Sequence, residues 1–170
     1  MKCTSSELAK LLRSLKEAEK LILSNERKSM FFSAALSEDI EEIRPEYEYK
    51  KLQEELMEIG RKIRVIKHAL NCFNVSTRLP GMDITIDQAL VYLPQLTARK
   101  EKLDKMQKHL ARERVEDRWD RSRSMIAEYE FANYDLNQVR EDYKKVNDEL
   151  TAVQNALDRV NITELIEVDF

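Results

Sequence analysis

The fold is decided by residues 49–73, which read YKKLQEELMEIGRKIRVIKHALNCF. A 3.5-residue repeat of apolar residues keeps one narrow stripe of a helix against a partner helix. At 1.5 Å per residue this helix would be roughly 37 Å long. A single apolar stripe does not make a helix stable in water, so the rest of the chain has to cover it. The repeat runs without interruption through Tyr49, Leu52, Leu56, Ile59, Ile63, Ile66, Leu70 and Phe73.

A second uninterrupted repeat lies near the end of the chain, and two further amphipathic segments precede it. We therefore predict one domain with helices over about residues 5–25, 45–73, 85–116 and 135–161. The third helix should be kinked at Pro94, which lacks an amide donor. In a capping box, the residue before a helix and the third residue of the helix each accept the backbone amide of the other with a side-chain oxygen. Such pairs mark three helix starts, at Thr4 with Glu7, Thr85 with Gln88, and Asp135 with Gln138. The second repeat consists of Leu136, Val139, Tyr143, Val146, Leu150, Val153, Leu157 and Val160.

Short β elements are predicted at the helix connections. Residues 30–36 are apolar, residues 125–131 alternate with a period of two, and the tail from Leu165 alternates again. Residues 76–84 contain a Pro-Gly pair and should form a hairpin-like corner. Helix directions place 30–36 and 125–131 at one end, where they would pair. The predicted fold class is all-α, an antiparallel four-helix coiled-coil bundle with short β elements at the helix connections.

Composition favours a non-enzymatic protein of the cytoplasm. The formal net charge is −3 and both signs are interspersed, so we expect neither a nucleic-acid partner nor a membrane surface. No apolar signal core or uncharged span occurs. Two histidines and two cysteines, Cys3 and Cys72, are too few for a closed zinc site or a disulfide framework. We predict no catalytic residue, no metal and no cofactor.

Three short motifs give the chain a resemblance to a known family. Asn71, Asn74 and Thr77 precede Gly81 and the pair Ile84-Thr85, the segment 117–121 reads Asp-Arg-Trp-Asp-Arg, and the segment 161–165 reads Asn-Ile-Thr-Glu-Leu. In these motifs the chain resembles the septicolysin-like family of small, largely uncharacterised bacterial helical proteins. The resemblance implies a helix–β–helix–corner–helix–β–helix order.

The segment 112–123 offers the candidate contact residues. It holds five arginines and one tryptophan, but Glu113, Glu116, Asp117 and Asp120 nearly cancel the charge. The pattern is typical of an ion-paired helix end, and the alternative is a small-ligand or nucleic-acid binding module that includes the adjacent β element. Possible ligand or partner contacts are Arg118, Trp119, Arg121, Arg123, Asn71 and Asn74.

Incomplete cover of the two long apolar stripes predicts self-association. The first helix is short and the third contains Pro94, so part of the longer stripes should stay open in a monomer. A dimer is the commonest way to bury such a stripe. We expect a scaffold or adaptor that self-associates and docks an unknown protein partner; closure of the core within one chain and an enzyme site between protomers are the alternatives. The predicted oligomer seam consists of Ile63, Ile66, Val146 and Val153.

Overall fold

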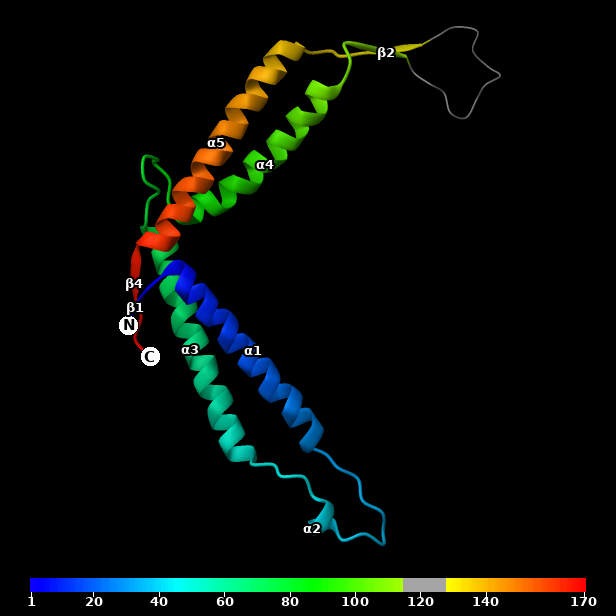
Figure 1. The fold of residues 1–170 in the computed structure, drawn as a ribbon, viewed down its shortest axis with the longest axis vertical. Helices are drawn as coiled ribbons and strands as arrows, with labels where there is room; N and C mark the ends of the chain where they lie inside the picture. Colours follow the sequence, from blue (N-terminus) through cyan, green and yellow to red (C-terminus); the bar gives the residue numbers. More distant parts are fainter. Residues whose placement is uncertain (115–127) are drawn as a thin grey trace, which may run out of the picture. The chain divides into compact units, whose positions relative to one another are not determined.

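The computed structural model describes residues 1–114 and 128–170. The chain divides into two compact units. Unit 1 comprises Met1–Thr77 and Arg159–Phe170, and unit 2 comprises Arg78–Asp158. Both are built mainly of helices, with short antiparallel strands (Figure 1), which confirms the mostly helical fold class. None of the helices in the described ranges is both long enough and apolar enough to span a membrane.

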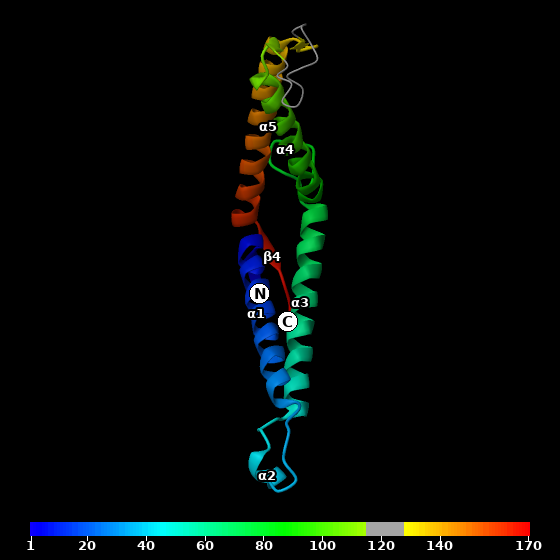
Figure 2. The same cartoon turned by 90° about the vertical axis from the view of Figure 1, so that its right-hand side faces the viewer.

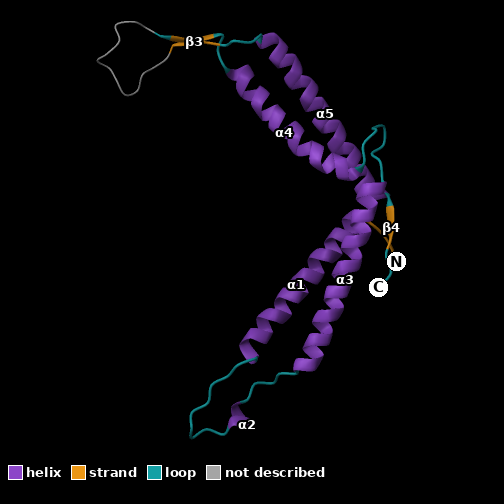
Figure 3. Cartoon of the chain, turned by 180° about the vertical axis from the view of Figure 1, so that it is seen from behind, coloured by secondary structure: helices purple, strands orange, loops and turns teal. Residues whose placement is uncertain are grey.

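Unit 1 is a helical hairpin closed by a two-stranded sheet. Helices α1 (Ser5–Ser29) and α3 (Tyr49–Ser76) lie side by side, and α2 (Ile40–Ile43) forms one turn in the connection between them (Figure 2). Strand β1 (Lys2–Thr4) pairs antiparallel with β4 (Leu165–Glu167), with Cys3 opposite Ile166. Figure 3 shows β4 beside the paired helices. The predicted C-terminal strand is therefore confirmed, and β1 is its partner.

The core of unit 1 lies where the sheet meets the helices. Leu8 from α1, Ile66 from α3, and Ile166 and Val168 from the C-terminal segment are buried together. Away from this sheet only two helices cover each other, and Leu21 of α1 is 63% exposed. A hairpin of two helices buries one stripe of each and leaves its flanks open to solvent.

Unit 2 is a second hairpin, made by α4 (Ile86–Lys108) and α5 (Leu136–Thr163), whose last residues belong to unit 1. The predicted corner forms: Leu79 donates its amide to the Ile84 carbonyl at 2.9 Å, and Gly81 takes a positive φ of 76°. The buried apolar residues of unit 2 come from the corner and both helices: Leu79, Ile86, Ala89, Leu96, Leu103, Val139, Val146, Val153 and Leu157.

Several boundaries differ from those predicted. Helix α1 continues to Ser29, and α3 begins at Tyr49 rather than at Pro45. Helix α4 ends at Lys108, so the prediction that it reaches residue 116 is wrong. Pro94 lies inside α4 and does not end it. A proline inside a helix removes one hydrogen bond and either kinks or breaks the helix, and α4 continues past Pro94 to Lys108.

The predicted strand pairing between residues 30–36 and 125–131 is wrong. Strand β3 (Tyr129–Phe131) pairs instead with β2 (Arg112–Arg114), whose residues had been predicted as helix. Residues 31–35 have no regular secondary structure. Two strands separated by a short connection pair at a lower entropic cost than two strands far apart in the chain. Residues 125–127 of the predicted strand lie outside the described residues.

The prediction that the seam residues stay open in a monomer is also wrong. Ile66, Val146 and Val153 are at most 2% exposed, and Ile63 is half-buried. Ile66 belongs to the core of unit 1, and the two valines are buried within unit 2. For Ile66, a count of apolar residues per helix missed this burial because the sheet β1–β4 supplies additional cover in unit 1.

Two of the three capping boxes form completely. Thr4 accepts the Glu7 amide at 3.2 Å, and the Glu7 carboxylate accepts the Thr4 amide at 2.8 Å. The same reciprocal pair joins Thr85 and Gln88. At α5 the box is half formed. Asp135 accepts the amides of Asn137 and Gln138, whereas the Gln138 side chain donates to Asp142.

Substitution of Thr4 by alanine should lower the free energy of unfolding by about 1 kcal/mol, because the first turn of α1 loses its capping oxygen. Hydrogen bonds from the Thr4 amide and hydroxyl lower the pKa of Glu7. The same substitution removes only the hydroxyl, so it should bring that pKa part of the way back to its usual value. Urea unfolding and a carboxyl titration by NMR measure the two effects. Ser14→Ala, at an exposed position within the same helix, is the control. Equal stability of the two variants would contradict the role of the cap.

Candidate partner-binding groove

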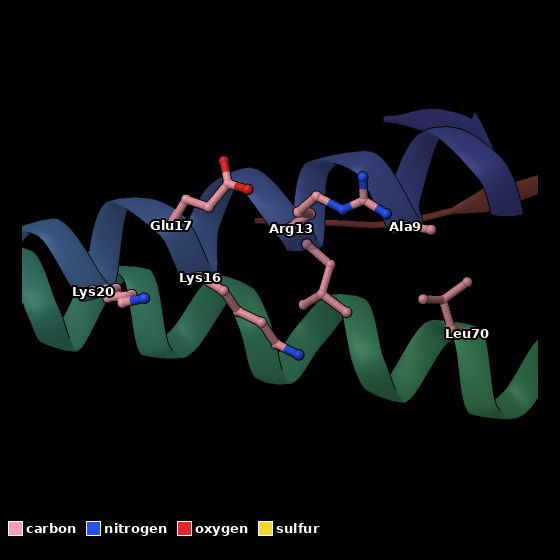
Figure 4. A pocket seen from close by; sticks show the side chains of 7 residues that line it. Ala9, Arg13, Lys16, Glu17, Lys20 and Leu70 are labelled. Carbon is pink, nitrogen blue, oxygen red and sulfur yellow. The ribbon is translucent and has the colours of Figure 1, made fainter.

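A groove of about 420 Å³ runs along one flank of the α1–α3 pair in unit 1. Three apolar side chains, Ala9, Leu12 and Leu70, form its floor. Figure 4 shows Lys16 extending across the groove toward α3, whereas Arg13 and Glu17 point away from α3. The groove is lined by Ala9, Leu12, Arg13, Lys16, Glu17, Lys20 and Leu70.

Helix spacing explains why these residues share one flank. Ala9, Leu12, Lys16 and Lys20 follow one another at intervals of three or four residues, which places them on one face of α1. That face adjoins the stripe that packs on α3. Leu12 is packed against the core of unit 1 and is still partly exposed to the groove.

The rim of the groove is basic. Three cations, Arg13, Lys16 and Lys20, stand against one carboxylate, Glu17. Lys67 of α3 is exposed and lies three residues before Leu70, so it adds a positive charge on the same flank. Within the described residues, the ion pairs shorter than 4 Å do not include any of these four cations. An apolar floor with a basic rim suits an acidic, amphipathic segment.

A second groove lies on the other flank of α3, beside the C-terminal segment. Cys72 and His68 line it together with Ile166 and Val168, and the volume is about 440 Å³. The Cys72 sulfur lies 3.6 Å from Nε2 of His68. Both Cys3 and Cys72 are free thiols. No third metal-ligating group joins this pair in the part of the chain that the structure describes.

The ribbon β2–β3 of unit 2 carries a stacked arginine. The guanidinium of Arg112 lies 3.7 Å from the ring centroid of Tyr129 and 5.7 Å from that of Phe131. Glu113 and Glu130 face each other across the two strands, an arrangement that places like charges opposite. Nε2 of His109 lies 3.6 Å from Oε2 of Glu130.

His109 should make the ribbon sensitive to pH. The Leu110 carbonyl accepts from Nδ1 of the imidazole at 2.8 Å, and this bond, with the charges of Glu130 and Glu113, raises the pKa of His109. A raised pKa means that the protonated imidazole stabilises the fold below the usual value of about 6.5, and that this contribution is lost as the pH rises through the raised pKa.

Hydrogen exchange at the ribbon amides, corrected for intrinsic rates, should show protection falling from pH 6 to pH 8, a window around the usual pKa of about 6.5. His109→Gln should remove this dependence, and His68→Gln, on α3 of unit 1, should leave it intact. Protection that is independent of pH in the unmodified protein would contradict the prediction.

The predicted contact residues are only partly placed. Arg118, Trp119, Arg121 and Arg123 lie outside the described residues. Asn71 is exposed and Asn74 is half-buried, both near the end of α3. Asn74 lies four residues after Leu70, so helix spacing places it on the flank of the groove. Sequence reasoning missed the groove lysines, because their spacing along α1 does not show that Leu70 of α3 lies beside them.

Comparisons with known proteins give a fold without a function. No family model matches the chain, and no curated protein matches it. A crystal structure of a functionally unknown conserved protein from Corynebacterium diphtheriae is similar, with a TM-score of 0.59 and 17% identity. The similarity covers 98% of this chain and 100% of that one. It shows that the two chains share a fold.

Proposed function

We propose that this protein is a non-enzymatic helical scaffold or adaptor that self-associates and docks a protein partner along its helices. In this proposal its four long helices act as antiparallel coiled-coil pairs. The septicolysin-like family and a location in the cytoplasm are part of the same proposal, since both rest on sequence patterns alone.

One observation carries the proposal: the α1–α3 groove has an apolar floor and a charged rim. A docked helix would bury Leu12 and Leu70, and its side chains would meet the lysines at the edge. Helices bind in grooves of this type through apolar residues spaced by three, four and seven positions. The groove is open along its length, which suits an elongated segment better than a small enclosed ligand.

The alternative is a small-ligand or nucleic-acid binding module at segment 112–123. The stacking of Arg112 on Tyr129 supports this alternative, because arginine and aromatic side chains bind nucleotide bases and phosphates. The opposed Glu113 and Glu130 argue against it, since a phosphate backbone would be repelled there. Binding of a single-stranded oligonucleotide that weakens steeply with salt would favour this alternative.

A photocrosslinker at the groove tests the docking function. Benzoylphenylalanine in place of Lys16, in the full chain within its native cell, should crosslink to a protein that mass spectrometry identifies. The matched control replaces Ser14, which is exposed and lies on the opposite flank of α1 by helix spacing. A groove position that crosslinks no more than the control would overturn the proposed function.

A further inference from the structure

The connection between α1 and α3 is unusually apolar for an exposed segment. Residues 30–43, which we name the distal loop, contain two phenylalanines, of which Phe31 is 79% exposed; Leu36 is fully exposed. Exposed apolar groups in this number mark binding surfaces on soluble proteins. The exposed apolar residues of the distal loop are Met30, Phe31, Phe32, Leu36, Ile40 and Ile43.

The distal loop has a defined local structure. Oδ1 of Asp39 accepts the Glu41 amide at 2.9 Å and caps α2, and Glu38 accepts the Ala35 amide at 2.7 Å. Arg44 lies 6.0 Å above the ring of Phe32. A segment that is ordered before binding loses less conformational entropy when it docks.

The distal loop and the groove are complementary in charge as well as in polarity. The loop sequence MFFSAALSEDIEEI carries four carboxylates and no cation, and one of the four, Glu41, pairs with the next residue after the loop, Arg44, at 2.7 Å. The groove presents three cations against one carboxylate around an apolar floor. Opposite potentials of this kind steer association and fix which surfaces meet.

The loop does not occupy the groove of its own chain. Helix α1 is continuous from Lys16 to Ser29, so Met30 lies about 21 Å along the axis from Lys16. The far end of the connection is tied to α1, because Glu26 accepts from the Tyr47 hydroxyl at 2.7 Å and from the Gln53 amide at 3.0 Å. A groove and a matching loop that lie apart within one chain can meet between two chains.

We propose that the groove binds the distal loop of a second copy of this chain. Two unit 1 hairpins lie antiparallel, and each loop fills the groove of the other, an isologous pair that closes on itself. The two-fold axis then passes midway between groove and loop. Leu23, which is 39% exposed and seven residues after Lys16, lies near that axis on the same flank. The inference rests on the proposed function and names a second copy of this chain as the partner that docks in the groove.

Charge reversal tests the contact in the full-length protein. The groove variant is Lys16→Glu with Lys20→Glu, and the loop variant is Glu41→Lys with Glu42→Lys. In a dimer of either variant, the groove and the loop carry charges of the same sign at both contacts. The dissociation constant of that dimer, measured by light scattering, should therefore rise at least tenfold. An equimolar mixture should regain unmodified affinity, because each reversed loop then meets a groove of opposite charge.

The equimolar mixture is also a control for misfolding, because an unfolded variant could not restore association. Lys144→Glu with Lys145→Glu makes the same change of charge on exposed positions of α5 and should leave dimerisation unchanged. An unmodified protein that stays monomeric at 100 micromolar, or a mixture that fails to associate, would overturn the inference. If the photocrosslinker in place of Lys16 still crosslinks to another protein in that case, the docking function stands without self-association. If the photocrosslinker crosslinks to no protein, both the docking function and the self-association are contradicted.

Discussion

Replacing Ile66 by alanine is expected to lower the free energy of unfolding by about 2–5 kcal/mol, the range for deleting a large aliphatic side chain from a packed core. Ile66 is fully buried, and it packs with Leu8, Ile166 and Val168 at the meeting point of α1, α3 and the C-terminal segment. These partners come from α1 and from the C-terminal segment, and a packed core relaxes only partly around the cavity that a deleted side chain leaves. Urea unfolding followed by circular dichroism measures the change.

Met57→Ala is the matched control for this substitution. Met57 lies on α3 as well, but it is 73% exposed, so its truncation should alter stability by less than about 0.5 kcal/mol. An Ile66→Ala variant as stable as the Met57→Ala variant would show that the core lies elsewhere.

Replacing Val146 by aspartate should unfold unit 2. Val146 is 2% exposed in α5, and a carboxylate placed there would be buried without a partner. The cost of such a charge is several kcal/mol, which is comparable with the total stability of a small unit. Hydrogen exchange should show loss of protection in α4 and in the part of α5 before residue 158, while α1 keeps its protection.

Lys144→Asp introduces the same side chain two residues away at an exposed position and should preserve protection throughout. Loss of protection in α1 to the same extent as in α4 would contradict the prediction that unit 2 unfolds while unit 1 stays folded. The comparison therefore tests the division of the chain as well as the burial of Val146.

The sequence predicts the helices well because their signals are local. The apolar repeat through Ile59 and Ile66 identifies α3, and reciprocal caps at Thr4 and Thr85 place two helix starts to within one residue. These signals depend on residues three or four positions apart, and such neighbours meet in any fold that contains the helix.

The strands and the groove could not be predicted in the same way. Strand β4 was predicted from its alternation, but its partner β1 has only three residues, too few to show a period of two, and the pairing joins Lys2 to Glu167. The charged triplet Arg112–Arg114 resembles the end of a helix until β3 is in place beside it. Lys16 and Lys20 look like ordinary surface lysines, and only the position of Leu70 on α3 turns them into the rim of a groove.

The pairing of β1 with β4 has a consequence for the order in which the chain is made. Leu8 and Ile66 emerge from the ribosome long before Ile166 and Val168, their partners in the core of unit 1. Residues 78–158 of unit 2 are complete before those partners exist. During synthesis the core of the α1–α3 hairpin therefore stays incomplete until residues 165–168 have been made. A chain stalled before residue 165 would retain that exposed core and would be the species most in need of a chaperone.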